Sequence, residues 1–450
     1  MASWAERWRR DFPALRTSRG KGVSYLDSAC MSLTPRLVLQ AMDEYYSRYP
    51  GCGGRSVHRW SSQVTEKVEA MREFSGHFFG GDPSGFVHVR NTTEAINIVA
   101  QGLDLHRGDV ILLTDQEHNS NLVVWQTLAK AIGLRLKFLE LPDDRAFDAD
   151  SYRDALIKGV RLVSFFHASN LDGRLLPGSE IVESAHDAGA QVLLDGSQAA
   201  PHHRLQLARL GVDYYALSLH KMLGPTGTGL LYGAPGALDR LHPLLSGGET
   251  VSWSDYESHE LLPGPARFEA GLQNYAGIVG AHAALRYLEK VDFSEMAGHE
   301  RHLQMELDRA TRDMPLQRVG LIEPDSKGPI FSFVIPGVDS HDVALFLDAG
   351  YGVLVRSGMN CVHSWYRSRG LEGSVRASFY LYTTDREVER LVCGIRELSE
   401  RVGKRGSERV RGSSPSRRRS RGQRATPSPG QNGSSSPRVR PRSLAGRSSR

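Results

Sequence analysis

The chain has 450 residues, of which 40% are hydrophobic and 8% aromatic. This length exceeds what one hydrophobic core usually supports, so we predict two or more domains. It has no long apolar run, and its start, "MASWAERWRRDFPAL", lacks the features of a signal peptide; we therefore exclude a membrane-spanning class and expect a cytoplasmic protein. The net charge of +5 is the sum of two regions of opposite charge: residues 401–450 carry +14 and the other 400 residues carry −9.

Apolar strand-like runs alternate with helical patterns along the middle of the chain. In chain order we predict a strand at 109–115, a helix at 121–132, a strand at 161–170, a helix at 180–190, and strands at 191–198, 214–221 and 229–233. This alternation predicts an α/β fold with a mostly parallel sheet covered on both faces. Ligands of such sheets bind at the carboxyl ends of the strands. The polar residues there are His118, Asn170, Asp195, Gln198, Ser218, His220 and Lys221.

The pattern changes after about Leu285. A helical stretch at 281–291 precedes strand-like runs at 330–336, 352–358 and 374–382, and a further helix begins at Asp385. We predict a large domain at 21–284, a smaller α+β domain at 285–402, and an N-terminal segment, 1–20, packed with the small domain. From residue 403 Arg, Ser, Gly and Pro dominate, which predicts a disordered basic tail at 403–450.

Lys221 stands where a strand should end, and a lysine in such a place is usually a solvated charge. Here Ser218 and His220 flank it, the glycine-rich turn "GPTGTG" follows, and Asp195 ends a separate strand. A lysine can form a Schiff base and a buried aspartate can pair with a pyridinium nitrogen; pyridoxal phosphate (PLP) requires both.

Two further features suit the same cofactor, although each has an ordinary structural alternative. Asn91, Thr92 and Thr93 precede an apolar helical pattern, which makes either a phosphate cradle or a plain helix cap. His118 follows the strand at 109–115. There it would either stack on a flat cofactor and transfer protons, or be an ordinary structural histidine.

Nine motifs follow one another along the chain: "YLDSACMSLTP", "RNTTEAIN", "EHNSN", "HASNLDGRLLP", "VLLDGSQAAPH", "DYYALSLHKMLGPTGTGLLYG", "RFEAGLQN", "GVLVRSGMNC" and "VRASFYLYTT". In this order they resemble one family, the class V PLP-dependent enzymes, and most closely its group II (Suf-type) cysteine desulfurases. The resemblance covers roughly residues 5–400 and implies a PLP-dependent transferase of fold type I, with a seven-stranded, mostly parallel sheet and a smaller α+β domain.

The resemblance implies a role for each site residue. Lys221 would hold PLP covalently, Asp195 would pair with the ring nitrogen, and His118 would stack on the ring. Gln198 would bind the phenolic oxygen. The phosphate would be bound by Thr92, Thr93, Ser218 and His220. The substrate carboxylate would be bound by Asn170 and Arg376, since a bidentate Arg–carboxylate pair suits that task.

Cys361 stands where these desulfurases carry their nucleophile. The resemblance implies that its thiolate takes sulfur from L-cysteine and releases alanine. We expect the nearby Arg356, also a candidate substrate-binding residue, to lower the pKa of this thiol. Residue type alone favours a small buried hydrophobe. Fourteen residues separate Cys361 from Arg376, which is similar to group II. That spacing implies a dedicated sulfur-acceptor protein, and the family implies a homodimer and donation of sulfur for Fe–S cluster or thio-cofactor assembly. Cys30 and Cys393 are interpreted as structural, and Cys52 as structural rather than a relay thiol. No ligand spacing indicates a metal.

Some positions depart from the family pattern. Leu272 replaces a threonine that reaches the neighbouring subunit's phosphate, Leu219 replaces a glycine, Met359 and Asn360 replace two histidines, and Gly54 replaces another. Two alternatives therefore stay open: another class V reaction, such as that of a selenocysteine lyase or an aminotransferase-like enzyme, and weak RNA binding by the basic tail, as an added function.

Overall fold

The computed structural model describes residues 4–17, 19–20, 22–321 and 328–412, with side chains described only as far as 402. Packing divides the chain into two units, residues 1–403 and 404–450. Helix α13 (Asp385–Gly412) continues past residue 403, where the tail was expected to begin. The disorder and RNA binding predicted for the tail otherwise concern residues 413–450, which lie outside the described part. Within the described residues, no helix is both long and apolar enough to cross a membrane.

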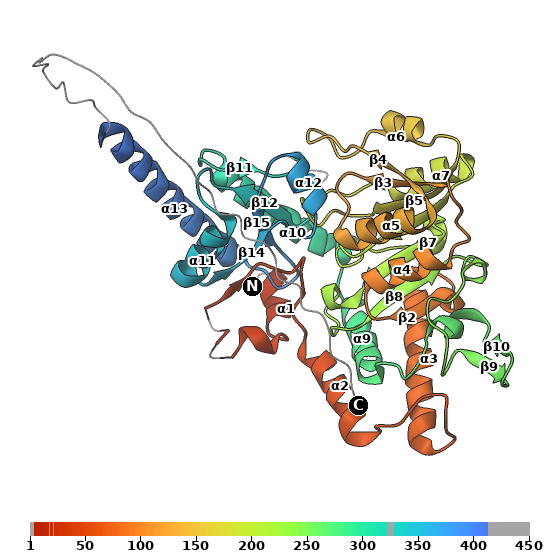
Figure 1. Ribbon diagram of the computed structural model, residues 1–450. Helices are drawn as coiled ribbons and strands as arrows, with labels where there is room; N and C mark the ends of the chain where they lie inside the picture. The colour runs from red at the N-terminus through yellow and green to blue at the C-terminus, as the bar shows by residue number, and fades with distance from the viewer. Residues whose placement is uncertain (1–3, 18, 21, 322–327, 413–450) are drawn as a thin grey trace, which may run out of the picture. The chain divides into compact units, whose positions relative to one another are not determined.

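The first unit contains a seven-stranded sheet (Figure 1). Strand β8 runs antiparallel to its neighbours β2 and β7, and the other neighbouring strands are parallel. In spatial order the strands are β2 (Phe86–Val89), β8 (Gly229–Gly233), β7 (Tyr214–Ser218), β6 (Gln191–Asp195), β5 (Val160–Phe166), β3 (Val110–Thr114) and β4 (Arg135–Leu139). The predicted mostly parallel sheet is confirmed.

Successive residues of the central strands enter hydrophobic cores on opposite faces of this sheet. Leu194 of β6 belongs to one core and its neighbour Leu193 to the other, as strand geometry requires. Burial on both faces explains why these strands read as continuous apolar runs. One face packs on α4 (Thr92–Gly102) and α5 (Asn119–Ile132). The opposite core includes residues of α2 (Arg36–Arg48), α3 (Arg59–Phe79), α6 (Ala149–Ala155), α7 (Gly178–Asp187), α8 (Leu207–Leu210) and α9 (Tyr275–Leu288).

A second, antiparallel sheet of four strands forms the α+β part of the fold. In spatial order it contains β11 (Gln317–Arg318), β12 (Ile330–Val334), β15 (Ser374–Ser378) and β14 (Arg356–Gly358). Its core includes Leu303 of α10 (Phe293–Thr311), Leu347 of α11 (Ser340–Tyr351) and Leu391 of α13. The domain boundary at 284/285 stays a prediction.

The strand predicted at 352–358 is wrong as a single element. It divides into β13 (Val353–Leu354), which pairs with β1 (Ser24–Tyr25), and β14, which pairs with β15. Residues of the N-terminal segment bond to the 285–402 part: in α1 (Trp4–Arg9), Trp4 Nε1 donates to Glu295 and Arg9 Nη1 donates to Glu387. The remaining elements are the hairpin β9 (Val251–Ser254) and β10 (His259–Leu261), α12 (His363–Ser368), and the 3₁₀ turns Pro13–Leu15, Pro83–Gly85, Leu219–Lys221, Leu238–Arg240 and Gly264–Phe268.

Candidate active site

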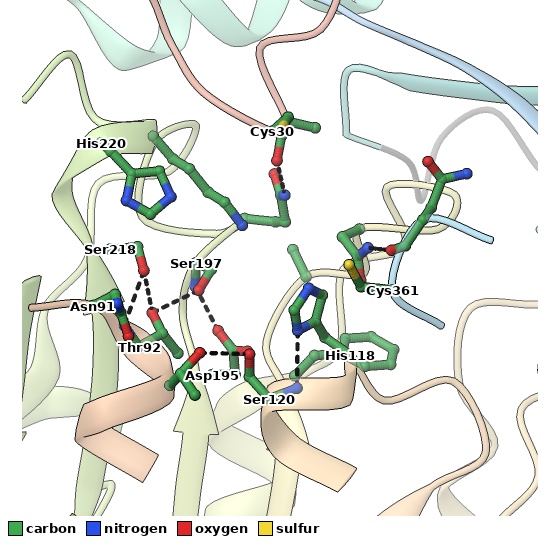
Figure 2. Close-up of a pocket in the computed structure, with 18 of the residues that line it drawn as sticks. Cys30, Asn91, Thr92, His118, Ser120, Asp195, Ser197, Ser218, His220 and Cys361 are labelled. Atoms are coloured by element: carbon green, nitrogen blue, oxygen red, sulfur yellow. Dashed lines mark hydrogen bonds between the residues drawn. The ribbon is translucent and has the colours of Figure 1, made fainter. Parts of the chain in front are cut away.

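All twelve site residues predicted from the sequence line one cavity of about 250 Å³ (Figure 2). They come from the strand ends of the large sheet, the start of α4, the strands β14 and β15, and the loop that follows β14. They are Thr92, Thr93, His118, Asn170, Asp195, Gln198, Ser218, His220, Lys221, Arg356, Cys361 and Arg376. The geometry therefore brings together residues that are up to 284 positions apart in the chain.

The parallel strands explain how the side chains from the large sheet meet. Asp195 is the last residue of β6 and Ser218 the last of β7, so both lie at the same edge. His118 caps the start of α5, shortly after β3, and Thr92 begins α4. This edge is where open α/β sheets bind ligands.

The N-terminus of α4 forms the predicted phosphate cradle. The side chain of Asn91 caps the helix, and Thr92 donates from its backbone N–H to Ser218 Oγ at 2.9 Å. Thr92 Oγ1 also lies 2.7 Å from both Ser218 Oγ and Ser197 Oγ. β8 approaches so closely that a Cβ on Gly229 would lie 2.8 Å from the Cα of Asn91. Hydroxyls and the positive end of a helix dipole suit a phosphate dianion.

Lys221 and Asp195 supply the charges that a pyridine aldehyde cofactor needs. Burial lowers the pKa of Lys221, and the charge of Arg376 lowers it further, whereas Asp195 opposes the shift. A larger neutral fraction makes the amine a better nucleophile toward an aldehyde. Asp195 is only 5% exposed, and its Oδ1 accepts a 2.9 Å hydrogen bond from the backbone of Ser197, which fixes the carboxylate.

His118 is neutral and its ring is oriented. Burial lowers its pKa to about 3, and the nearby charges of Lys221 and Arg376 act in the same direction. Its Nδ1 accepts a hydrogen bond of 3.0 Å from the backbone N–H of Ser120, which leaves the ring proton on Nε2. A neutral, flat imidazole can stack on an aromatic ring and still donate a proton.

Arg376 makes the cavity receptive to an anion. It is 2% exposed; Nη1 donates to the backbone oxygen of Asn170 at 2.9 Å and Nη2 to Asp27 Oδ1 at 3.3 Å. Its Nε and Oε1 of Gln198 are buried without a hydrogen-bond partner among the described residues. A buried polar atom without a hydrogen-bond partner destabilises the fold, so these two atoms favour a polar ligand in the cavity. The residues present therefore fit PLP and a carboxylate substrate.

The loop that carries Cys361 is held in an unusual backbone conformation. Asn360 and Cys361 have φ angles of 47° and 61°, in the left-handed region that non-glycine residues rarely adopt. Two hydrogen bonds hold this backbone: Asn119 N–H donates to the oxygen of Cys361 at 2.8 Å, and Asn170 Nδ2 donates to that of Asn360 at 2.7 Å. Arg356 Nη2 lies 3.9 Å from Cys361 Sγ. The thiol is therefore fixed in the cavity beside a positive charge.

Cys30, interpreted from the sequence as structural, lines the same cavity. Its Sγ lies 2.9 Å from Arg356 Nη1. The sequence held a signal for it, since Cys30 lies inside the motif "YLDSACMSLTP" beside Ala29, whose backbone oxygen accepts a hydrogen bond from Gln198. The cavity lining also includes Asn91, which the sequence placed in the possible phosphate cradle, and Ser120, Ser197 and Asn360, to which the sequence gave no ligand role.

The two substituted leucines line a different cavity, of about 340 Å³, and not the one that holds Lys221. Leu219 is buried in the core, whereas Leu272 is 62% exposed. Leu219 therefore does not narrow the predicted cofactor site, even though it immediately precedes His220.

A sequence profile of the family described as "Aminotransferase class-V" matches residues 24–391, and the chain belongs to this family. Within it, the chain is similar to proteins named as cysteine desulfurases. It is 36% identical over 398 residues to a probable cysteine desulfurase of Halalkalibacterium halodurans, covering 87% of this chain and 97% of that protein. It is 37% identical to probable cysteine desulfurase 2 of Mycobacterium leprae, covering 86% and 94%.

Solved structures give the same relationship. The apo cysteine desulfurase of Thermococcus onnurineus has a TM-score of 0.84 and 35% identity, covering 88% of this chain and 98% of that one. The cysteine desulfurase CsdA of Escherichia coli, solved as an S-sulfonic acid form, has a TM-score of 0.80 and 31% identity, covering 87% and 98%.

Proposed function

We propose that this chain is a PLP-dependent cysteine desulfurase that converts L-cysteine to L-alanine and keeps the sulfur as a persulfide on Cys361. One observation carries the proposal: a single cavity holds a lysine with a lowered pKa, a buried carboxylate, a helix N-terminus, a buried arginine and a thiol beside a guanidinium. The relatives named as cysteine desulfurases support the same reaction.

In this proposal Lys221 would hold PLP covalently and Asp195 would pair with its ring nitrogen. Gln198 would bind the phenolic oxygen of PLP, and His118 would stack on its ring. The phosphate would be bound by Thr92, Thr93, Ser218 and His220. When bound, PLP supplies an electron sink for the substrate's α-carbon.

The chain's own residues then orient the substrate and accept its sulfur. Arg376 binds the substrate carboxylate through its guanidinium, and Asn170 contributes its side-chain amide. His118 carries a proton on Nε2 that it can give to the product carbon or leaving group. Cys361 attacks the substrate sulfur as a thiolate, and Arg356 stabilises that negative charge.

The decisive experiment compares Cys361→Ala with a matched control, Cys393→Ala, which removes an exposed thiol. We expect Cys361→Ala to lose alanine and sulfide formation from L-cysteine by about 100-fold or more, while it still binds PLP. Cys393→Ala should retain both. Full sulfide release by Cys361→Ala would reject the mechanism, and no alanine from L-cysteine in the unmodified enzyme would favour another class V reaction.

The proposal extends to partners and compartment. The sulfur acceptor is a separate protein, and the enzyme is a homodimer, for which the exposed Leu272 and Leu245 beside the second cavity provide apolar surface. A cytoplasmic location is supported by the four cysteines, all of which are free thiols. Sedimentation of the purified chain tests the dimer: a concentration-independent monomer mass would contradict it.

A further inference from the structure

Two thiols of the active-site cavity share one guanidinium. Arg356 Nη1 lies 2.9 Å from Cys30 Sγ, and Arg356 Nη2 lies 3.9 Å from Cys361 Sγ. Both cysteines line the cavity that also holds Lys221 (Figure 2). The other two cysteines of the chain, Cys52 and Cys393, do not line this cavity. The arrangement thus distinguishes Cys30 from an ordinary structural cysteine.

The backbone around Cys30 is fixed toward the cavity. The N–H of Ala29 donates to Ser378 Oγ at 2.9 Å, and its oxygen accepts from Gln198 Nε2 at 2.7 Å. Cys30 N–H donates to the oxygen of Asp27 at 3.0 Å. Cys30 is partly exposed, so a reagent in the cavity can reach its sulfur.

Two other groups in the same cavity indicate that a ligand belongs there. Arg376 is 2% exposed and its Nε has no partner among the described residues; Gln198 is 4% exposed and its Oε1 also has none. The pair of thiols therefore faces a polar site built to be occupied, and does not belong to a packed core. The charge of Arg356 is available to a thiolate on either cysteine.

We propose that Cys30 is a second sulfur carrier of the active site, which receives the outer sulfur atom from the Cys361 persulfide. The inference rests on the proposed desulfurase function. The Cys30 thiolate attacks the outer sulfur; a new S–S bond forms on Cys30 Sγ, and the S–S bond to Cys361 Sγ breaks. The electron pair leaves on Cys361 as a thiolate, which Arg356 stabilises. The persulfide proton stays with the transferred sulfur, and no oxidant or reductant is consumed.

The geometry favours this transfer for two reasons. A persulfide places its outer sulfur about 2 Å beyond Cys361 Sγ, which extends the reach of the loop. The same guanidinium can then hold the attacking thiolate and the leaving thiolate, so little charge has to move away from its counter-ion. The transfer also returns Cys361 to its thiolate form for a second substrate while the first sulfur is still on the enzyme.

The test uses the PLP-loaded full chain and sulfur-labelled L-cysteine, followed by mass spectrometry of trapped persulfides. Unmodified enzyme should carry label on Cys361 first and on Cys30 later. Cys30→Ala should carry label on Cys361 alone, and Cys361→Ala on neither cysteine. Cys52→Ala is the matched control, because it removes a thiol outside the cavity, and it should behave as the unmodified enzyme does.

Each failure has a distinct meaning. Label on Cys361 with none on Cys30 at any time would overturn the relay and leave the desulfurase function intact. Label on neither cysteine of the unmodified enzyme would reject the proposed function itself. A Cys30–Cys361 disulfide formed with release of sulfide, or label on Cys30 in Cys361→Ala, would also overturn the proposed transfer.

A second measurement needs no turnover. Dibromobimane becomes fluorescent when two neighbouring thiols displace both of its bromides, so it reports on the pair directly. We expect fluorescence in the unmodified enzyme and in Cys52→Ala, and its loss in both Cys30→Ala and Cys361→Ala. Equal fluorescence in all four proteins would contradict the pairing of the two thiols.

Discussion

Arg376 donates a hydrogen bond of 2.9 Å from Nη1 to the backbone oxygen of Asn170, so the two residues proposed to bind the substrate carboxylate also bind each other. The bond orients the guanidinium while its Nε stays unpartnered among the described residues. The carboxylate site is therefore preorganised before substrate arrives, and binding does not have to immobilise a free arginine side chain.

Arg376→Lys should lower kcat/KM for L-cysteine by about 10–100-fold, since a lysine keeps the positive charge but cannot form the planar, bidentate pair. The visible absorbance of bound cofactor should stay unchanged. Steady-state alanine formation measures the first effect and a spectrum of the purified protein the second. An unchanged kcat/KM would exclude Arg376 as the carboxylate ligand.

Lys221→Ala should remove the visible absorbance that PLP gives when it is bound to a lysine, and alanine formation with it. Lys158→Ala is a suitable control, because Lys158 is exposed and lies outside the cavity. Absorbance spectra before and after addition of PLP decide the matter. A band that persists in Lys221→Ala would refute the assignment of this lysine.

Glu269→Gln should destabilise the fold by about 3–5 kcal/mol, because it leaves a buried arginine without its counter-charge. Both oxygens of Glu269 lie 3.0 Å from nitrogens of Arg72, and its backbone partner is His88 N–H at 2.7 Å. The control is Glu69→Gln, since Glu69 also pairs with Arg72 but its side chain is 61% exposed. Urea unfolding measures both; similar losses in the two variants would contradict this account.

The same carboxylate predicts a loss of stability in acid. Although burial alone would raise the pKa of Glu269, His88 and Arg72 outweigh it and lower the pKa to about 2. The native state thus favours the ionised form, so this contribution is present above the unfolded pKa of about 4.5 and disappears as pH falls toward 2. Glu269→Gln should show a weaker dependence on pH in this window.

Four histidines with lowered pKa values, one of them buried and three partly buried, predict a second loss of stability as pH falls below about 6.5. Burial lowers the pKa of His118 to about 3, and those of His167, His203 and His220 to about 4. The pKa of an unfolded histidine is near 6.5, so below that pH the unfolded state binds more protons than the native state. As pH falls, each of these histidines therefore lowers the free energy of unfolding by up to about 1.4 kcal/mol per pH unit, until the pH reaches its native pKa.

His167→Gln should reduce the steepness of this decline by close to one proton. His167 is buried and its Nδ1 lies 2.8 Å from Tyr215 Oη, outside the cofactor contacts. His106→Gln, at a side chain that is 72% exposed, should leave the slope unchanged. Thermal unfolding from pH 7 to pH 4.5 measures it, and an identical slope in both variants would rule out a contribution from His167.

The sequence was sufficient for the part of the site that the parallel sheet creates. Asp195 and Ser218 end neighbouring parallel strands, so their meeting at one edge follows from the strand pattern alone. The roles of Arg376 and Cys361 came from family resemblance, because no local pattern connects strands of the second sheet to that edge.

The motif around Cys30 was visible in the sequence, but the place of this cysteine beside Arg356 could not be predicted, for a different physical reason. It depends on the pairing of β1 with β13, two-residue strands separated by more than 300 residues, which leave no periodic signal in the sequence. The left-handed backbone at Asn360 and Cys361 was equally hidden, since neither residue type requires it. These features depend on strand pairing over a long sequence distance and on tertiary contacts that outweigh local backbone preference, so local sequence patterns could not predict them.

The register of β14 and β15 places Arg356 directly opposite Arg376. Like charges in this relation repel. Burial lowers the pKa of Arg376 and the charge of Arg356 lowers it further, whereas Asp27 opposes the shift. A carboxylate bound there would relieve the repulsion as well as satisfy Arg376, so substrate-sized anions should act as stabilisers of the whole protein.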